Sequence, residues 1–241
     1  MLTKKTIIYK IDGKTIDEKN AKSGGGIDVK LPDNSIIQQI NSIGNIIKQC
    51  ADIIKSGGVV VFPTETVYGV GADAFNDKAV KDIYFAKKRP PKKPLLCHCG
   101  SIRQAEQIAY LNDDARRLIE AFTPGPLSVI VKKKSSISDT VTSNGDTVGL
   151  RFPSNKIFLR LSEYAGCPIA ATSANISGNI SAKNGDEVIK ELFGRVDAII
   201  DAGDTEYGLE STIVSLVGKA KIIRQGAVGR KEIEEVISLC D

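Results

Sequence analysis

The chain has 241 residues, enough for one ordinary α/β domain, and no shift in composition forces a division. Its 33 basic and 29 acidic residues leave a net charge of +4, too mild to indicate a nucleic-acid-binding protein by charge alone. The five cysteines form no CxxC pair, so we expect reduced thiols. With no signal peptide and no apolar run near the roughly 18 residues of a membrane span, we expect a soluble, cytoplasmic protein.

The N-terminal segment predicts a strand, an insertion and a helix. Thr6 to Ile11 favours a strand, and Asp12-Gly13 is a hairpin signal. The polar, glycine-rich stretch that follows is typical of a flexible excursion. Apolar residues then recur at helical spacing from Ile36 to Ile54, with an N-cap at Asn34 or Ser35. We therefore expect a hairpin with an insertion over residues 1–35 and the main domain over 36–241.

A strand, a loop and a helix are predicted next. Val59 to Phe62 lie between a glycine pair and a proline, which indicates a short strand buried on both faces. The polar segment after it contains Gly69 and Gly71, and we expect a loop whose glycines let a ligand approach the backbone. Asn76-Asp77 provides an N-cap for a helix that ends before Pro90.

Five cations lie between Lys87 and Lys93. Cations in the last turn of a helix are favourable against its carbonyl end, so a solvated helix end is one explanation. We expect Pro90-Pro91 to hold the loop extended, and so dense a cluster beside a Gly/Thr loop suits polyphosphate. From these residues alone, a phosphate site and a solvated basic face are about equally favoured.

The remaining apolar segments predict further strands and helices. The expected strands are Leu95 to Cys97, Leu127 to Val131, Thr147 to Phe152, Ile169 to Thr172, Val196 to Asp201, Ile213 to Leu216 and Ile222-Ile223. The expected helices contain Ile102 to Ile108, Asp113 to Phe122 and Gly229 to Leu239. Lys132 to Lys134 form a surface run that an anionic partner such as tRNA could contact.

Two polar side chains stand out on these strands. His98, the one histidine, ends a strand, and a neutral histidine in the core is its commonest role. Cys97 and Cys99 would point to the opposite face from it, so we expect no zinc site. Arg151 lies inside an otherwise apolar strand and needs an anion, either a structural carboxylate or a ligand.

Several motifs together resemble one family. The runs PTETVYGVGADAFN from Pro63 and KKRPPKKPL from Lys87 are joined by PGPLSVIV, DTVGLRFP, TSANISG and GLESTIVSL further along. In order and approximate spacing they are similar to the YrdC-like family, the threonylcarbamoyl-AMP synthases. The resemblance spans roughly Ile43 to Arg230. It implies a single α/β domain with a twisted mixed sheet, flanking helices and a central basic cleft.

The resemblance also implies a reaction and its residues. Family members make L-threonylcarbamoyladenylate and pyrophosphate from L-threonine, bicarbonate or CO2, and ATP, for tRNA modification. Carried over by motif, Lys87 and Arg89 would serve catalysis. The nucleotide would be bound by Arg89, Lys93, Thr147, Ser173, Asn175, Ser181 and Arg224. Threonine would be bound by Thr66, His98, Arg151, Ala171 and Ser211. Mg²⁺ would accompany ATP, and downstream tRNA-modifying transfer proteins would take the product.

The chain departs from the family pattern at three positions. Lys93 stands where members often have asparagine, Thr172 where proline is usual, and Gln225 where proline commonly follows the arginine. Two other functions stay open. One is an RNA-binding module without catalysis, although seven phenylalanines, six tyrosines and no tryptophan offer few stacking rings. The other is a domain that adenylates a carbamoyl group from another donor, as in hydrogenase-maturation proteins.

Overall fold

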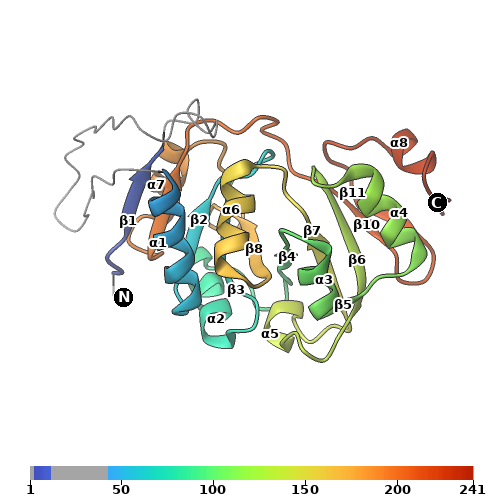
Figure 1. Ribbon diagram of the computed structural model, residues 1–241, viewed down its shortest axis with the longest axis horizontal. Coiled ribbons are helices and arrows are strands. Elements are labelled where there is room, and N and C mark those ends of the chain that lie inside the picture. Colours follow the sequence, from blue (N-terminus) through green and yellow to red (C-terminus); the bar gives the residue numbers. More distant parts are fainter. Residues whose placement is uncertain (1–2, 12–42, 241) are drawn as a thin grey trace.

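The computed structural model describes residues 3–11 and 43–240, which form one mixed sheet with helices packed against it (Figure 1). The strands are β1 Ile7–Lys10, β2 Val60–Phe62, β3 Gly69–Asp73, β4 Leu96–His98, β5 Ala109–Tyr110, β6 Leu127–Lys133, β7 Thr147–Arg151, β8 Ile169–Ser173, β9 Ala198–Asp201, β10 Thr212–Ser215 and β11 Lys221–Arg224. The helices are α1 Ile43–Lys55, α2 Asp77–Lys87, α3 Ile102–Ile108, α4 Asp113–Phe122, α5 Asp139–Thr142, α6 Lys156–Ala165, α7 Gly185–Leu192 and α8 Arg230–Glu234.

Some expectations concern residues outside the described ranges. These are the Asp12-Gly13 turn, the polar insertion and the predicted start of the first helix. The end of that helix is described: α1 stops at Lys55, and Gly57 just beyond it has a φ of +84°, which glycine adopts without strain. Within residues 3–11 and 43–240, no helix has both the length and the apolarity needed to cross a bilayer.

The sheet is twisted and mixed, as predicted. Neighbouring strands follow the order β1-β9-β2-β3-β8-β4-β7-β6-β10-β11, with β5 paired to β6. β4 and β7 are parallel and end together, so that His98 lies in register with Arg151. On the other side of β7, Ser128 of β6 is also paired with Arg151. This register brings polar residues from distant parts of the sequence together at the ends of neighbouring inner strands.

Apolar clusters cover both faces of the sheet. Val60 and Phe62 of β2 pack with buried residues of α1 and α6, which lie side by side in Figure 1. Val61 belongs to a second cluster that includes the inner face of α2. Val60, Val61 and Phe62 are fully buried, which confirms the prediction of a strand buried on both faces. Burying each such side chain contributes about 1.5–3 kcal/mol.

The predicted loop at Gly69 and Gly71 is wrong, because both glycines belong to β3. A Cβ built on Gly69 would lie 2.7 Å from Phe62 Cε2, and one on Gly71 would lie 2.6 Å from Ile169 Cγ2. These glycines therefore let β3 pack closely between β2 and β8. Alternating small residues gave no strand signal in the sequence.

The predicted C-terminal helix is shorter than expected. Helix α8 covers Arg230–Glu234 instead of Gly229 to Leu239. Ile233 and Ile237 are buried as predicted, while the chain turns after the helix. The backbone N–H of Cys240 then donates to Ala220 O at 2.8 Å, an interaction that a continued helix would not allow. Tertiary pairing outweighs helical periodicity here.

Candidate functional site

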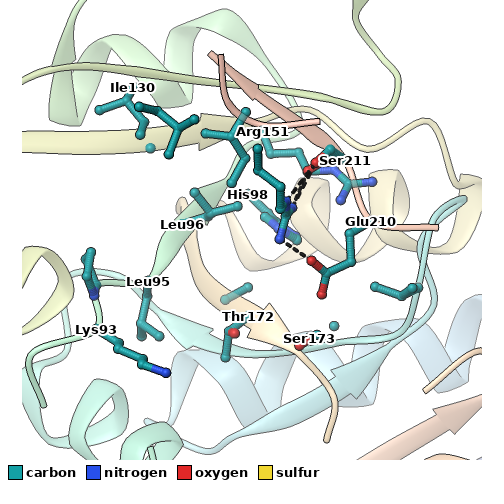
Figure 2. A pocket seen from close by; sticks show the side chains of 18 of the residues that line it. Lys93, Leu95, Leu96, His98, Ile130, Arg151, Thr172, Ser173, Glu210 and Ser211 are labelled. Carbon is teal, nitrogen blue, oxygen red and sulfur yellow. Dashed lines mark hydrogen bonds and ion pairs between the residues drawn. The ribbon is translucent and has the colours of Figure 1, made fainter. Parts of the chain in front are cut away.

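A cavity of about 480 Å³ opens beside the ends of β4, β7 and β11, a size typical of small-molecule sites. Figure 2 shows side chains from several of its walls pointing toward one another. Nine of the residues predicted from the sequence line it: Arg89, Lys93, His98, Thr147, Arg151, Ala171, Ser173, Ser211 and Arg224. The structure thus brings together residues that are spread over most of the main domain.

The basic loop turns back on itself after α2. Asn76 caps the start of α2, as predicted, by accepting from Ala79 N at 3.1 Å. Lys88 at the other end has a left-handed backbone with a φ of 52°. The N–H of Lys93 donates to Pro90 O at 3.0 Å, so the expectation of an extended loop is wrong. Two prolines fix φ but leave the following residues free to close a turn.

Arg89 anchors this turn at the cavity wall. Its Nε donates to Lys93 O at 3.0 Å, and Nη2 donates to Pro94 O at 2.8 Å. Burial lowers the pKa of Arg89, but an arginine remains charged at any physiological pH. The loop carbonyls therefore hold a fixed positive charge at the entrance to the cavity.

Lys87 is buried behind the cavity wall. Only 1% of the residue is exposed, and its Nζ donates to the backbone carbonyls of Ser173 and Asn175. Burial first, and then the nearby charge of Arg89, lowers the pKa of Lys87 to about 7. The explanation of the basic cluster as a solvated helix end is therefore wrong for Lys87. Its ammonium instead fixes the loop that follows β8.

Arg151 has a carboxylate partner inside the protein. Its Nη2 donates to Glu65 Oε1 at 2.9 Å and to Thr66 Oγ1 at 2.6 Å. The other Glu65 oxygen accepts from Ser154 N at 3.1 Å. Burial lowers the pKa of Arg151, and the charge of Glu65 opposes that shift. The anion that Arg151 needs is thus a carboxylate of the protein, which was one of the two predicted possibilities. Arg151 Nε, however, is buried without a hydrogen-bond partner in the described part of the chain.

His98 is a buried, neutral side chain at the same end of the sheet. Its ring lies edge-on to Phe62 and Phe158, with centroids 5.9 and 5.6 Å away. Burial, with a smaller contribution from the charge of Arg151, holds the pKa of His98 well below its usual value. His98 Nδ1 is buried and unpartnered among the described residues, like Arg151 Nε. Two orphaned polar nitrogens therefore occur on neighbouring cavity-lining residues.

An ion pair between Arg224 and Glu210 forms another part of the cavity lining. Arg224 pairs with Glu210, and its Nε and Nη2 donate to Ser211 O at 3.1 and 2.9 Å. Ser181 Oγ donates to the other Glu210 oxygen at 2.6 Å. Ser211 Oγ lies 2.9 Å from Ser128 Oγ. These contacts tie the ends of β10 and β11 to the loop after β8.

Four predicted site residues do not line the cavity, and each contacts a residue that does. Thr66 bonds to Arg151, and Ser181 bonds to Glu210. Lys87 and Asn175 both support Ser173, whose Oγ donates to Asn175 Oδ1 at 2.6 Å. The Asn175 amide in turn donates to Ile176 O and Asn179 O. The cavity therefore has a supporting layer as well as a lining.

Sequence reasoning missed Glu210 and the role of Glu65. Glu210 lines the cavity directly before Ser211, inside a motif that was already singled out. Glu65 belongs to the first motif and is 3% exposed, yet its partner lies 86 positions away. The signal for Glu210 was a carboxylate inside a motif otherwise made of small, hydroxyl and apolar residues, whereas the motif of Glu65 also contains Asp73. Among the described residues, no group of three or more His, Cys, Asp or Glu side chains is placed to hold a metal.

Comparison with known proteins places the chain in a family. Residues 52–226 match the family model Sua5/YciO/YrdC, described as "Telomere recombination". A threonylcarbamoyl-AMP synthase from Pyrococcus abyssi is 41% identical over 79% of this chain and 57% of its own length. One from Bacillus subtilis is 41% identical over 79% of this chain and 56% of its own. The chain thus spans little more than half the length of these relatives.

A solved structure shares the fold. It is described as P. abyssi Sua5 complexed with L-threonine and aligns with a TM-score of 0.79 at 40% identity. The alignment covers 80% of this chain and 58% of that one. The matched family model extends over most of the main domain and includes every residue of the site described above. The chain belongs to the Sua5/YciO/YrdC family.

Proposed function

We propose that the chain is a nucleotidyltransferase that makes threonylcarbamoyl-AMP and pyrophosphate from L-threonine, bicarbonate or CO2, and ATP. The observation that carries this proposal is the convergence of Arg89, Arg151 and Arg224 with neutral His98 on one cavity. Three guanidinium groups suit a reaction that must hold the carboxylate of threonine, an anionic carbamate and the phosphates of ATP. The relatives named threonylcarbamoyl-AMP synthase support the choice of reaction.

Threonine is assigned to the buried end of the cavity. Arg151 Nε is a charged donor without a partner there among the described residues, and a carboxylate is its natural acceptor. His98 Nδ1 is a second unpartnered polar atom, available to the hydroxyl or amine of the amino acid. Thr66 holds Arg151 in place, while Ala171 and Ser211 line the same cavity. The small side chain at Ala171 leaves room for a ligand.

ATP is assigned to the part of the cavity whose lining residues are more exposed. Arg89, Lys93 and Arg224 provide positive charge for its phosphates, and Thr147 and Ser173 provide hydroxyls. Lys87, Asn175 and Ser181 act as positioning residues, since each contacts the lining without belonging to it. Mg²⁺ enters with ATP as part of the substrate. Phosphate oxygens would provide most of its ligands, because Glu210 is the one carboxylate among the described lining residues.

The chemistry follows from positioning and charge. The threonine amine attacks CO2 and loses a proton, which gives a carbamate. A carbamate oxygen then attacks the α-phosphorus of ATP, and the bond to the departing pyrophosphate breaks. Because the carbamate oxygen is itself the attacking group, this step uses no nucleophile from the enzyme. Cations at the α-phosphate and pyrophosphate stabilise the developing charge.

The product would pass to proteins that transfer the threonylcarbamoyl group to tRNA, inside the cytoplasm. Release of pyrophosphate is the direct assay. Wild-type protein with ATP and Mg²⁺ should release it only when L-threonine and bicarbonate are both present. Arg89→Ala should abolish release, whereas Arg117→Ala, on the exposed face of α4, should not. Release without threonine, or equal loss in both variants, would refute the proposal.

A further inference from the structure

Glu210 binds Arg224, which the proposed function assigns to ATP, and Ser181, which the family resemblance places on the nucleotide side. One oxygen of its carboxylate pairs with Arg224 Nη1, and the other accepts from Ser181 Oγ at 2.6 Å. Figure 2 shows this carboxylate reaching from the segment of Ser211 into the cavity, on the side of Ser173. A carboxylate and a phosphate oxygen compete for the same guanidinium and hydroxyl donors. Glu210 therefore sits where a phosphate group would be bound.

The local geometry allows a ligand to displace the Glu210 side chain from Arg224 and Ser181. Its side chain and that of Arg224 are 35% and 36% exposed, so neither is locked into the core. Arg224 stays in place without Glu210, because its Nε and Nη2 donate to Ser211 O. The backbone of Glu210 is also held, since Glu210 O accepts from Ala227 N at 3.2 Å. Rotation about the side-chain bonds of Glu210 is enough to free Arg224 and Ser181 together.

The charge of Glu210 acts on three cations in and beside the cavity. Burial lowers the pKa values of Lys87, Arg89 and Arg151, and the negative charge of Glu210 opposes that effect in all three. In the described structure, Glu210 thus partly neutralises a cluster of cations. A ligand that displaces it must supply at least as much negative charge, which a polyphosphate does.

We infer that Glu210 is a resident carboxylate that fills a phosphate position and is displaced by ATP, so that it selects polyphosphates over weaker anions. This inference rests on the proposed function, because it takes the cavity as the nucleotide site. Displacement costs the contacts to Arg224 and Ser181, which reduces the apparent affinity for ATP and pyrophosphate. For a partly exposed pair we expect a reduction of about 3- to 10-fold.

The experiment measures binding of ATP and of inorganic pyrophosphate by calorimetry at constant Mg²⁺. Glu210→Gln should bind both about 3- to 10-fold more tightly than wild type. Glu206→Gln removes the same charge from an exposed position of the same loop and should leave both affinities nearly unchanged. Glu210→Asp keeps the charge but is too short to span Arg224 and Ser181, so it should also bind more tightly than wild type.

The outcomes separate the inference from the proposed function. Unchanged or weaker binding by Glu210→Gln would show that Glu210 only orients Arg224, and would overturn the inference alone. Wild-type affinity in Glu210→Asp, with tighter binding in Glu210→Gln, would show a general charge effect and would also overturn it. Wild-type protein that binds neither ATP nor pyrophosphate would overturn both. Circular dichroism spectra of each variant verify folding.

Discussion

The buried ion pair between Glu65 and Arg151 allows a quantitative test of what holds the site together. The side chains are only 2% and 5% exposed, and 2.9 Å separates Glu65 Oε1 from Arg151 Nη2. Glu65→Gln keeps the shape of the side chain but removes its charge, which leaves the guanidinium buried without a counter-ion. Breaking a buried pair in this way costs about 3–5 kcal/mol. Because glutamine can still accept from Ser154 N, we expect a loss of about 3 kcal/mol.

Urea unfolding at pH 7 measures this loss as a change in the free energy of unfolding. The matched control is Asp114→Asn, which breaks the exposed pair with Arg117, whose side chains are 37% and 59% exposed. That change should cost less than about 1 kcal/mol. Arg151→Met combined with Glu65→Gln should lose less than the sum of the single variants. A loss below about 1 kcal/mol for Glu65→Gln alone would refute the reasoning.

Four further results are expected. Lys87→Met removes the donor to Ser173 O and Asn175 O, so the affinity of the folded protein for ATP should fall about tenfold. An affinity equal to that of wild type, measured by calorimetry, would argue against a positioning role for Lys87. Burial lowers the pKa of Lys87 to about 7 in the folded state, so between pH 7 and about 10 the unfolded chain binds more protons than the folded one. As the pH rises through this window, the free energy of unfolding of wild type, measured with urea, should therefore increase relative to that of Lys87→Met. Since burial holds the pKa of His98 well below its usual value, the NMR signal of this single histidine should not titrate between pH 6 and 8, and a midpoint near 6.5 would contradict its buried, neutral state. Gly71→Ala should destabilise the protein by about 1–3 kcal/mol, because the new Cβ would lie 2.8 Å from Ala170 O, and an unchanged melting temperature would show that β3 adapts.

Local sequence signals predicted the elements that depend on neighbours in the chain. The apolar run at β2, the cap at Asn76 and the end of α2 before Pro90 were all readable, because each follows from short-range packing or backbone geometry. The segment Gly69–Asp73 was not, because its glycines become strand residues only through close packing against Phe62 and Ile169. Helices α6 and α7 were not predicted either, although Asn155 and Asn184 cap them.

The site itself depended on contacts between distant residues. That Arg151 needs an anion was evident from its apolar strand, but Glu65 could not be paired with it across 86 positions. The other assignments came from motif resemblance, and the structure gathers eight of them, together with Arg151, around one cavity. Burial of Lys87 was hinted at by its place on the apolar face of its helix, with Val80 and Ile83. Its hydrogen bonds to backbone carbonyls carried no sequence signal.

The proposed reaction requires that one cavity joins threonine, CO2 and ATP. Incubation with ¹³C-labelled bicarbonate, L-threonine, ATP and Mg²⁺, followed by mass spectrometry of the nucleotide products, tests it most directly. We expect an adenylate that contains threonine and one labelled carbon, formed in step with pyrophosphate and absent in Arg89→Ala. ATP binding without any labelled adenylate would contradict it, and would favour an RNA-binding module or a different carbamoyl donor.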